Sequence, residues 1–281
     1  MLREACLPRS LLRTPEPSAT MDAAESIAGF DEQGALALLP IYYFNALAIG
    51  GLAPDGAHIV DLGCGTGRFL AYLAARRPDL CITGLDFAPE MVRVGQNHIA
   101  RAGLEGRVRL IHGDMREFRK LTAGRADLVS SIFSLHHLAT RDDLLACLRE
   151  AAAAIAVDSA LLWIFDHARP RRRCTAEEVP EIFTPDASLA FREDSRNSLC
   201  ASWSLAELGA ALSETLPPGY HGARSRLLPL YQIHWTEPLV AARKGQWVED
   251  HDLQPALRRQ AQLLARLFRW VPQSPTGGRR P

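Results

Sequence analysis

An acidic residue and three regularly spaced glycines stand out in the first half of this 281-residue chain. Asp61 precedes glycines at positions 63, 65 and 67, and Asp86 and Asp114 follow further along the chain. Glycine adopts backbone conformations that other residues avoid, so a ligand can approach the main chain closely. A helix that begins at such a turn also directs its N-terminus at the ligand. The spacing therefore predicts a ligand-binding turn between a strand and a helix.

Two well-known glycine motifs do not fit this turn. A dinucleotide-binding turn requires a third small residue where this chain has Arg68. A phosphate-binding P-loop ends in Gly-Lys-Ser or Gly-Lys-Thr, and no such sequence follows Gly67. The ligand is therefore expected to be neither NAD nor a nucleoside triphosphate held in those ways.

The elements that position these residues follow from an alternation of short apolar runs and helical patterns after residue 57. Such alternation predicts a parallel sheet covered by helices on both faces. Strands are expected at 58–62, 80–86, 108–112, 126–132 and 160–165, helices at 68–76, 89–102, 142–155 and 205–216, and two short strands within 226–236. The three aspartates then lie at or just beyond the ends of successive strands.

The segments around this core carry separate expectations. Residues 1–22 contain three prolines and no apolar signal-peptide core, so we expect a disordered leader, with Met21 as an alternative start. The uncharged stretch 33–54 approaches the length of a membrane span, but Pro40 and Asn45 interrupt it, and a buried helix over 36–49 is expected instead. The predicted domain covers 23–237 with an inserted lid at 169–202, and a helical extension follows at 238–281.

The composition narrows the class of protein. The chain is 47% apolar and has 32 acidic and 32 basic residues, which argues against binding DNA through bulk charge. Six cysteines without a CxxC pair suit the reducing cytoplasm, and no metal-ligand spacing is present. Arginine and alanine are abundant and lysine is rare, which is typical of a bacterial protein encoded in GC-rich DNA.

Over about residues 55–168 the chain resembles the class I S-adenosylmethionine-dependent methyltransferases of small molecules. Their first motif looks like residues 61–67, and Asp86, Asp114-Met115 and the stretch 126–138, which ends in Ser-Leu-His-His-Leu, follow in the family's order. The resemblance implies a Rossmann-like, doubly wound α/β fold. It implies seven strands, the last of them antiparallel, and S-adenosylmethionine as cofactor, with S-adenosylhomocysteine as product.

The resemblance also implies roles for individual residues. The glycines leave room for the cofactor, Asp61 organises the methionine ammonium group, and Asp86 accepts both ribose hydroxyls. Asp114 takes the adenine amino group, with Met115 or Phe87 against the ring. The expected cofactor-binding residues are Asp61, Gly63, Cys64, Gly65, Gly67, Asp86, Phe87, Met91, Asp114, Met115 and Ser131. Any one aspartate also fits a helix N-cap, but three at successive strand ends favour the site.

The methyl acceptor is expected beyond the ends of the fourth and fifth strands. The sulfonium is already an activated leaving group, so alignment matters most, and a base is needed only for a hydroxyl or thiol acceptor. The candidate catalytic residues are His136, Asp166 and His167, and the candidate acceptor contacts are Tyr42, Tyr43, His137 and Asn197. Alternatively, one histidine only packs beneath the site. No metal is expected, because spacing places no third ligand beside the His-His pair.

We therefore predict transfer of a methyl group from S-adenosylmethionine to O, N, S or C of a small molecule. DNA is disfavoured as acceptor, since the chain lacks both the Asn/Asp-Pro-Pro-aromatic sequence and the Pro-Cys pair of DNA-methylating enzymes. A non-catalytic protein that binds the cofactor or a partner remains an alternative, as does an RNA or protein methyltransferase that uses the tail helix. The tail helix also leaves open a homodimer.

Overall fold

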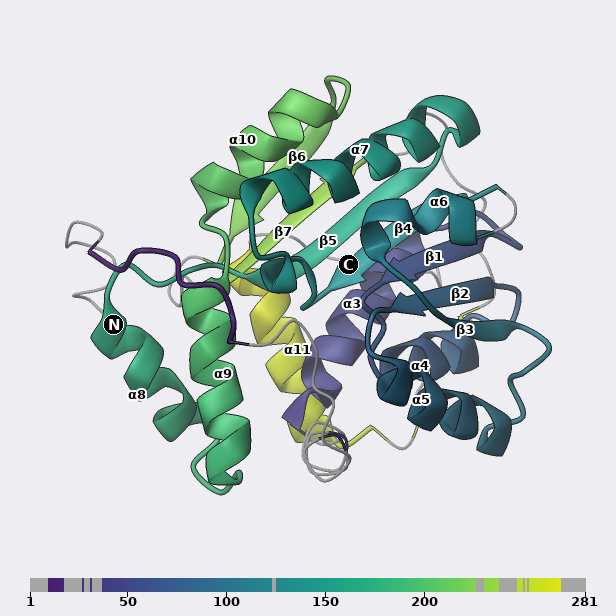
Figure 1. Cartoon of the computed structure of the whole chain (residues 1–281). Coiled ribbons are helices and arrows are strands. Elements are labelled where there is room, and N and C mark those ends of the chain that lie inside the picture. The colour runs from purple at the N-terminus through teal and green to yellow at the C-terminus, as the bar shows by residue number, and fades with distance from the viewer. Residues whose placement is uncertain are drawn as a thin grey trace, which may run out of the picture.

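A seven-stranded sheet forms the centre of the molecule, which a computed structural model describes for residues 10–17, 27, 31, 37–122, 125–225, 230–237, 247–249, 251 and 253–268 (Figure 1). The strands lie in the order β3-β2-β1-β4-β5-β7-β6. Their bounds are β1 His58–Leu62, β2 Cys81–Asp86, β3 Val108–His112, β4 Leu128–Ile132, β5 Leu161–His167, β6 Tyr220–Arg224 and β7 Tyr231–Thr236.

Strands β1 to β5 are parallel, and β7 is antiparallel to β5, which confirms the expected Rossmann-like arrangement. The order reverses between β1 and β4, where open α/β sheets bind ligands outside the carboxyl ends of their strands. The residues that follow β1, β2, β4 and β5 therefore meet at one edge. The glycine turn, the acidic residues and the histidines lie at this edge because each of them follows or ends one of these strands.

Helices cover both faces of the sheet and bury two separate apolar clusters (Figure 1). One layer contains α3 Leu39–Leu52, α4 Arg68–Arg76, α5 Pro89–Arg101 and α11 Pro255–Leu267. The other contains the 3-10 turn η1 Met115–Glu117, α6 Phe118–Leu121, α7 Arg141–Asp158 and α10 Leu205–Thr215. Strands buried on both faces account for the nearly continuous apolar runs of the sequence.

Helix α3 is the buried N-terminal helix that the uncharged stretch predicts, displaced by three residues from the expected bounds. Its one polar core residue, Asn45, donates to the carbonyl of Ile41 and accepts from the indole N–H of Trp163 at 2.7 Å. The amide therefore costs little to bury, because both of its sides are hydrogen-bonded. Among the described residues, no helix is long and apolar enough to cross a membrane.

The tail helix packs on the domain that carries it. Residues Ala261, Leu264 and Ala265 of α11 are buried, and Phe268 stacks on Phe44 of α3 at 5.8 Å between ring centroids. The apolar stripe of this helix is thus covered within the chain. Arg258, Arg259 and Arg266 also lie on this helix, and the residues after 268 lie outside the described part.

One predicted strand is misplaced. The sequence analysis expects the last strand pair within 226–236, whereas β6 lies earlier, at Tyr220–Arg224. This edge strand pairs with β7 on one side only, so it carries polar residues and shows no apolar run. Residues 226–229 lie outside the described residues.

The insert and part of the N-terminal segment lie side by side (Figure 1). The insert forms two helices, α8 Arg173–Phe183 and α9 Leu189–Ala201. Contrary to the expected disordered leader, residues 10–17 have a defined position: Leu11 is 3% exposed, and the Arg13 guanidinium lies 3.7 Å above the ring of Trp203. Arg13 also donates to the carbonyls of Ala201, Leu138, Ala139 and His136. A partly buried arginine that bridges four carbonyls accounts for the defined position of this segment.

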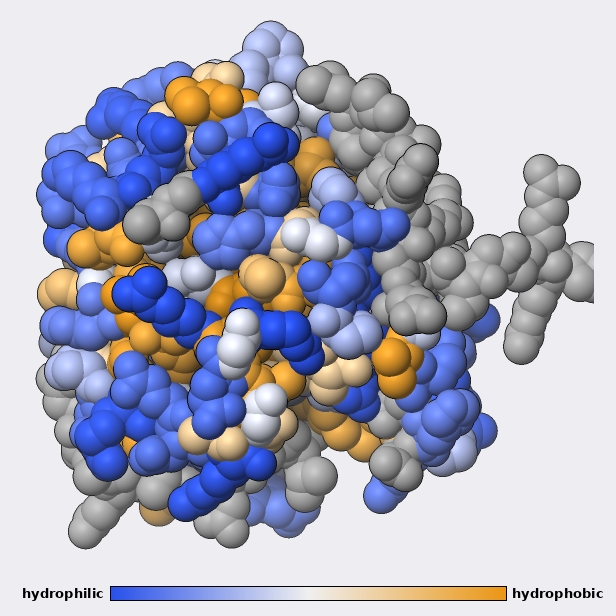
Figure 2. Space-filling view, turned by 90° about the vertical axis from the view of Figure 1, so that its right-hand side faces the viewer, coloured by the Kyte–Doolittle hydropathy of each residue, from blue (hydrophilic) through white to orange (hydrophobic). Residues whose placement is uncertain are grey.

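The face of the molecule that Figure 2 shows is largely hydrophilic, and its apolar side chains lie in small groups between polar ones. Such scattered apolar residues are ordinary on a folded domain. This side of the molecule therefore offers no large apolar docking surface among the atoms coloured there.

Candidate active site

The turn after β1 brings the main chain of three glycines to the sheet edge. Gly63, Gly65 and Gly67 all have positive φ angles, 73°, 54° and 67°. The amides of Gly63 and Cys64 donate to the carbonyl of Leu85 at the end of β2, and Gly67 caps α4. The left-handed backbone explains why glycine occupies each of these positions.

The three glycines have different neighbours, which the sequence does not reveal. A Cβ atom at Gly63 would lie 2.3 Å from Ser134 Cβ, and one at Gly67 would lie 2.9 Å from Leu110 Cδ1. A Cβ at Gly65 meets nothing within 4 Å. Gly63 and Gly67 therefore leave room for the protein itself, and only Gly65 faces the open space expected for a ligand.

Asp86 closes β2 directly beside this turn. Its carboxylate accepts hydrogen bonds from the backbone amides of Gly65, at 2.7 Å, and Ala88, at 2.9 Å. Burial raises the pKa of Asp86, while these amides and the nearby His137 act in the opposite direction. A carboxylate has about four acceptor positions, so two remain for a ligand that carries hydroxyl groups.

Asp61 lies inside the sheet rather than at its surface. Its side chain is 2% exposed and accepts a 2.5 Å hydrogen bond from Ser130 Oγ on β4. Burial raises the pKa of Asp61 to about 7, and the charge of Asp86 adds to this effect. The carboxyl is thus poised to ionise when a positive group is placed beside it.

Asp114 has the contacts of a helix cap. It accepts from the backbone amide of Arg116 and pairs with the guanidinium of the same residue at 2.6 Å, and that guanidinium also contacts Asp143 of α7. The pKa of Asp114 is lowered: burial opposes the shift, and the Arg116 contacts outweigh it. Asp114 therefore caps the 3-10 turn η1, which is the alternative role that a single aspartate could have.

The other residues expected to contact the cofactor differ in their exposure and in their neighbours. Phe87 is 48% exposed directly after Asp86, with its ring 6.4 Å from that of His112. Met115 and Met91 are buried, and Met115 reaches the vicinity of Gly63. Ser131 is bonded to Ser134, and the Cys64 side chain packs beside Gly84.

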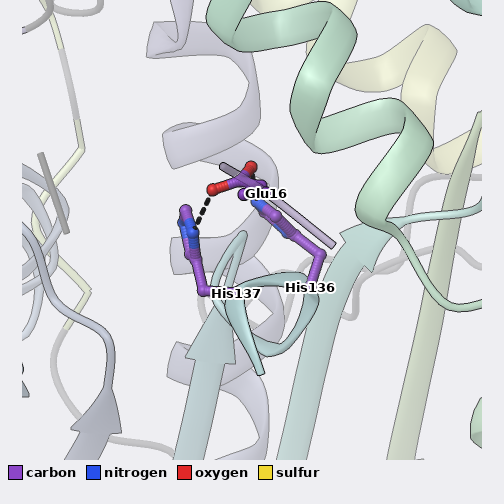
Figure 3. A group of neighbouring side chains, drawn as sticks. All are labelled: Glu16, His136 and His137. Carbon is purple, nitrogen blue, oxygen red and sulfur yellow. Dashed lines mark ion pairs between the residues drawn. The ribbon is translucent and has the colours of Figure 1, made fainter. Parts of the chain in front are cut away.

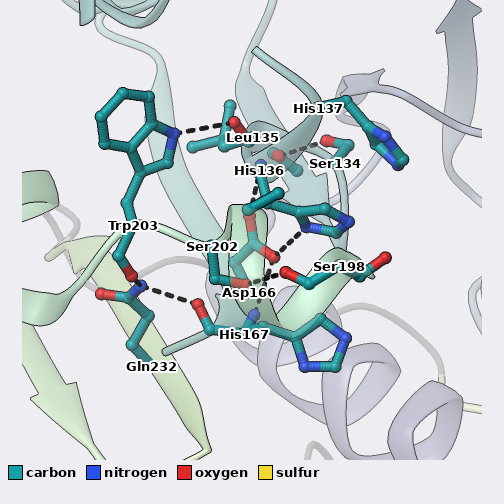
Figure 4. Close-up of polar contacts among 12 residues, drawn as sticks. Ser134, Leu135, His136, His137, Asp166, His167, Ser198, Ser202, Trp203 and Gln232 are labelled. Atoms are coloured by element: carbon teal, nitrogen blue, oxygen red, sulfur yellow. Dashed lines mark hydrogen bonds and ion pairs between the residues drawn. The ribbon is translucent and has the colours of Figure 1, made fainter. Parts of the chain in front are cut away.

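Beyond β4 and β5, His136 and Asp166 form a buried pair (Figure 4). Asp166 Oδ1 lies 2.7 Å from His136 Nδ1, and Oδ2 accepts from the backbone amide of His136. Burial raises the pKa of Asp166, but the neighbouring His136 outweighs burial and the net pKa is lowered. An ionised carboxylate only accepts, so Nδ1 carries a hydrogen and donates it to Asp166, while Nε2 lies on the far side of the ring.

A carboxylate from the N-terminal segment faces Nε2 of His136 (Figure 3). Glu16 Oε1 lies 3.7 Å from His136 Nε2, and Oε2 lies 2.6 Å from His137 Nδ1. Ser198 Oγ on α9 donates to Oε1 at 2.7 Å. Burial opposes ionisation of Glu16, but the contacts with His137 outweigh it and lower the pKa of Glu16 to about 2.

His167 completes the cluster. Its ring stacks on Phe133 at 4.4 Å between centroids and lies 5.5 Å from the ring of His136. Burial and the proximity of His136 lower its pKa to about 3, so the ring is neutral near pH 7. Among the described residues its buried Nδ1 has no hydrogen-bond partner.

The structure thus brings His136, His137, Asp166 and His167 together, but it places both tyrosines elsewhere. Tyr42 packs on Phe69 of α4, and Tyr43 is buried beneath Arg258 of α11. Asn197 lies partly buried on α9, next to Ser198. Sequence reasoning missed Glu16, Ser198, Asp194 and Arg13, because nothing in a proline-rich leader or a polar insert marks these residues as neighbours of the histidines.

The comparisons with known proteins agree with this geometry. Residues 59–158 match the family described as Methyltransferase domain, which confirms the resemblance over that segment. Over 87 residues the chain is 37% identical to the trans-aconitate 2-methyltransferase of Mycobacterium tuberculosis, and over 97 residues it is 30% identical to the ajmaline N-methyltransferase of Rauvolfia serpentina. These segments cover 31% and 34% of this chain and 30% and 33% of the relatives, so the chain matches about a third of each.

A solved structure extends the likeness of fold beyond that segment. The plantazolicin methyltransferase BamL, crystallised with a triazolic desmethylPZN analog and SAH, is 15% identical, with a TM-score of 0.56. The alignment covers 75% of this chain and 89% of that one. The chain therefore has the expected class I fold and resembles a methyltransferase domain over residues 59–158.

Proposed function

We propose that this chain transfers the methyl group of S-adenosylmethionine to a small-molecule acceptor. The observation that carries the proposal is the open space above Gly65, on the turn that follows the buried Asp61 of β1, where the Gly65 amide donates to the carboxylate of Asp86. Methyltransferase relatives over residues 59–158, and a fold neighbour solved with SAH, support the same cofactor.

In this site the chain's own residues bind and align. Gly65 leaves room for the cofactor, Asp86 accepts hydroxyl groups of its ribose, and the amino end of α4 favours its carboxylate. Asp61 ionises beside the methionine ammonium group. Asp114 contacts the adenine amino group with the same carboxylate that the Arg116 guanidinium engages.

The acceptor side is assigned to the cluster around His136. In the transfer, the methyl–sulfur bond breaks with both electrons left on sulfur, and a lone pair of the acceptor forms the new bond. A hydroxyl or thiol acceptor must also release a proton. His136, held in orientation by Asp166, is the side chain proposed to contact the acceptor, with His167 and Asn197 beside it and helices α8 and α9 as the lid.

Calorimetric titration with S-adenosylhomocysteine tests the proposal, followed by an assay for its release from S-adenosylmethionine in the presence of a metabolite extract. One-to-one binding and extract-dependent release support a small-molecule methyltransferase. Binding without release indicates the non-catalytic alternative. No binding by the folded chain contradicts the proposal.

A further inference from the structure

Two imidazoles and one carboxylate converge where the acceptor is expected (Figure 3). One ligand atom each from Glu16, His136 and His137 lies within 4.8 Å of the other two. Two ligands of one zinc ion, each about 2.1 Å from the metal, are roughly 3–4 Å apart, so small side-chain shifts suffice to bring all three onto one ion. Two histidines and one glutamate are also a known ligand set of catalytic zinc.

The groups behind these ligands are those that metal sites use. Metal-binding histidines commonly donate their other ring N–H to a carboxylate, which fixes the tautomer, and ligating carboxylates are themselves hydrogen-bonded. Asp166 holds His136 Nδ1 in this way and leaves Nε2 free to face Glu16. Ser198 Oγ donates to Glu16 Oε1 and orients that carboxylate.

An ordinary ion pair accounts poorly for the contacts. His137 Nδ1 is only 2.6 Å from Glu16 Oε2, yet within the described residues it has no hydrogen-bond partner of acceptable geometry. His136 Nε2 lies 3.7 Å from the same carboxylate, which is beyond hydrogen-bond distance. Three ligand atoms that lie within 4.8 Å of one another without good hydrogen-bond geometry between them fit a shared metal ion better than a simple ion pair.

The charges of the cluster favour a cation. The carboxylate side chains of Glu16 and Asp166 are buried, at 7% and 2% exposed. The neighbouring Arg13 directs its guanidinium at backbone carbonyls and the Trp203 ring. Imidazole ligands select zinc and similar transition metals over magnesium or calcium.

We propose that Glu16, His136 and His137 bind one transition-metal dication of the zinc type. Three protein ligands leave a coordination position open, as in catalytic zinc sites. The role of the ion rests on the proposed function: it would hold the acceptor oxygen, nitrogen or sulfur and ease the loss of its proton, in place of a histidine base. Binding of the ion itself does not depend on methyl transfer.

Cobalt titration tests the site. The tag-free, reduced chain is stripped of metal with a chelator, and Co²⁺ is added while the visible d–d absorption is followed. Zn²⁺ competition then gives the affinity. We expect one low-symmetry Co²⁺ per chain, and loss of the band in both His137→Ala and Glu16→Gln. His221→Ala, which removes a half-exposed histidine on β6, serves as the matched control and keeps the band. Asp166→Asn, which removes the group that orients His136, weakens Zn²⁺ binding about 10- to 100-fold.

Three results would overturn the proposal. If the wild-type chain binds no Co²⁺ with a d–d band, the contacts are an ion pair only. If the band survives in both ligand variants, the metal lies elsewhere. If an intense thiolate band appears in the near ultraviolet, a cysteine is the ligand. Circular dichroism verifies folding, and S-adenosylhomocysteine titration of the metal-free chain tests the cofactor separately, so failure of one proposal is distinguishable from failure of the other.

Discussion

Two neighbouring regions are built differently: residues 61–67 with Asp86, proposed to bind the cofactor and called the cofactor edge, and the cluster of Glu16, His136, His137, Asp166 and His167, proposed to contact the acceptor and called the acceptor cluster. Backbone conformation determines the shape of the cofactor edge, because a left-handed glycine turn between β1 and α4 is hydrogen-bonded to the end of the adjacent strand β2. The acceptor cluster is instead formed by side chains, which come from residue 16, the turn after β4, the end of β5 and helix α9. Steric changes should therefore disable the edge, whereas loss of a single functional group should disable the cluster and leave the edge intact.

The largest effect is expected from Gly65→Val. The new side chain fills the open space above the turn, so S-adenosylhomocysteine binding falls below detection in a calorimetric titration while the chain stays folded. Gly103→Val is the matched control, because Gly103 also has a positive φ, +66°, and open surroundings but follows α5 at the opposite edge. Equal affinities in the two variants would refute the assignment of the turn.

The second prediction concerns turnover without binding. His136→Ala should lower the rate of S-adenosylhomocysteine release about 10²- to 10⁴-fold, the usual contribution of a group that assists proton loss, with cofactor affinity nearly unchanged. His58→Ala, a partly buried histidine at the amino end of β1 with both ring nitrogens bonded, should keep its turnover. A His136→Ala enzyme with wild-type turnover would remove this residue from the catalytic set.

The third prediction compares two carboxylates at the cofactor edge. Asp86→Ala should weaken cofactor binding about 10- to 150-fold, because it removes a charge-assisted hydrogen bond worth about 1.5–3 kcal/mol. Asp114→Asn should cost less, because Arg116 already occupies that carboxylate and the amide retains an acceptor oxygen. If titration shows the larger loss for Asp114→Asn, the ribose and adenine roles are exchanged.

The last prediction concerns the stability of the fold and not ligand binding. The pKa of Asp61 is about 7 in the folded chain against 3.8 for the free group, so the folded state holds a proton that the unfolded state has lost between these values. This group's contribution to the free energy of unfolding therefore falls as pH rises from about 4 to 7, by up to about 1.4 kcal/mol per unit. Denaturant unfolding of Asp61→Asn should lack this slope. A difference between the two proteins that is constant with pH would contradict the burial argument.

Local spacing was enough to predict the cofactor edge. Residues 61–67 and Asp86 lie on adjacent strands, and the sheet alternation places both at one edge, so the fold and the turn followed from the sequence. The different neighbours of Gly63 and Gly65 did not, because they depend on Ser134, which lies on another strand's turn.

The cluster depended on contacts between distant segments. His136, Asp166 and His167 were predictable from strand ends, but Glu16 reaches them only because Arg13 and Leu11 fasten residues 10–17 against the insert. Tyr42 and Tyr43 were misleading for the opposite reason. An apolar helix offers several faces, and packing against α4 and α11 turned these rings away from the cluster. The polar edge strand β6 gave no apolar signal.

Methyl transfer from S-adenosylmethionine to a small molecule is tested most directly by one measurement. Methyl-labelled S-adenosylmethionine is incubated with the chain and a metabolite extract, and the products are separated on a size-exclusion filter. We predict release of S-adenosylhomocysteine matched by label in the small-molecule fraction, both lost in Gly65→Val and retained in Gly103→Val. Label retained on protein or RNA, or release of S-adenosylhomocysteine that is equal in the two variants, would contradict the claim.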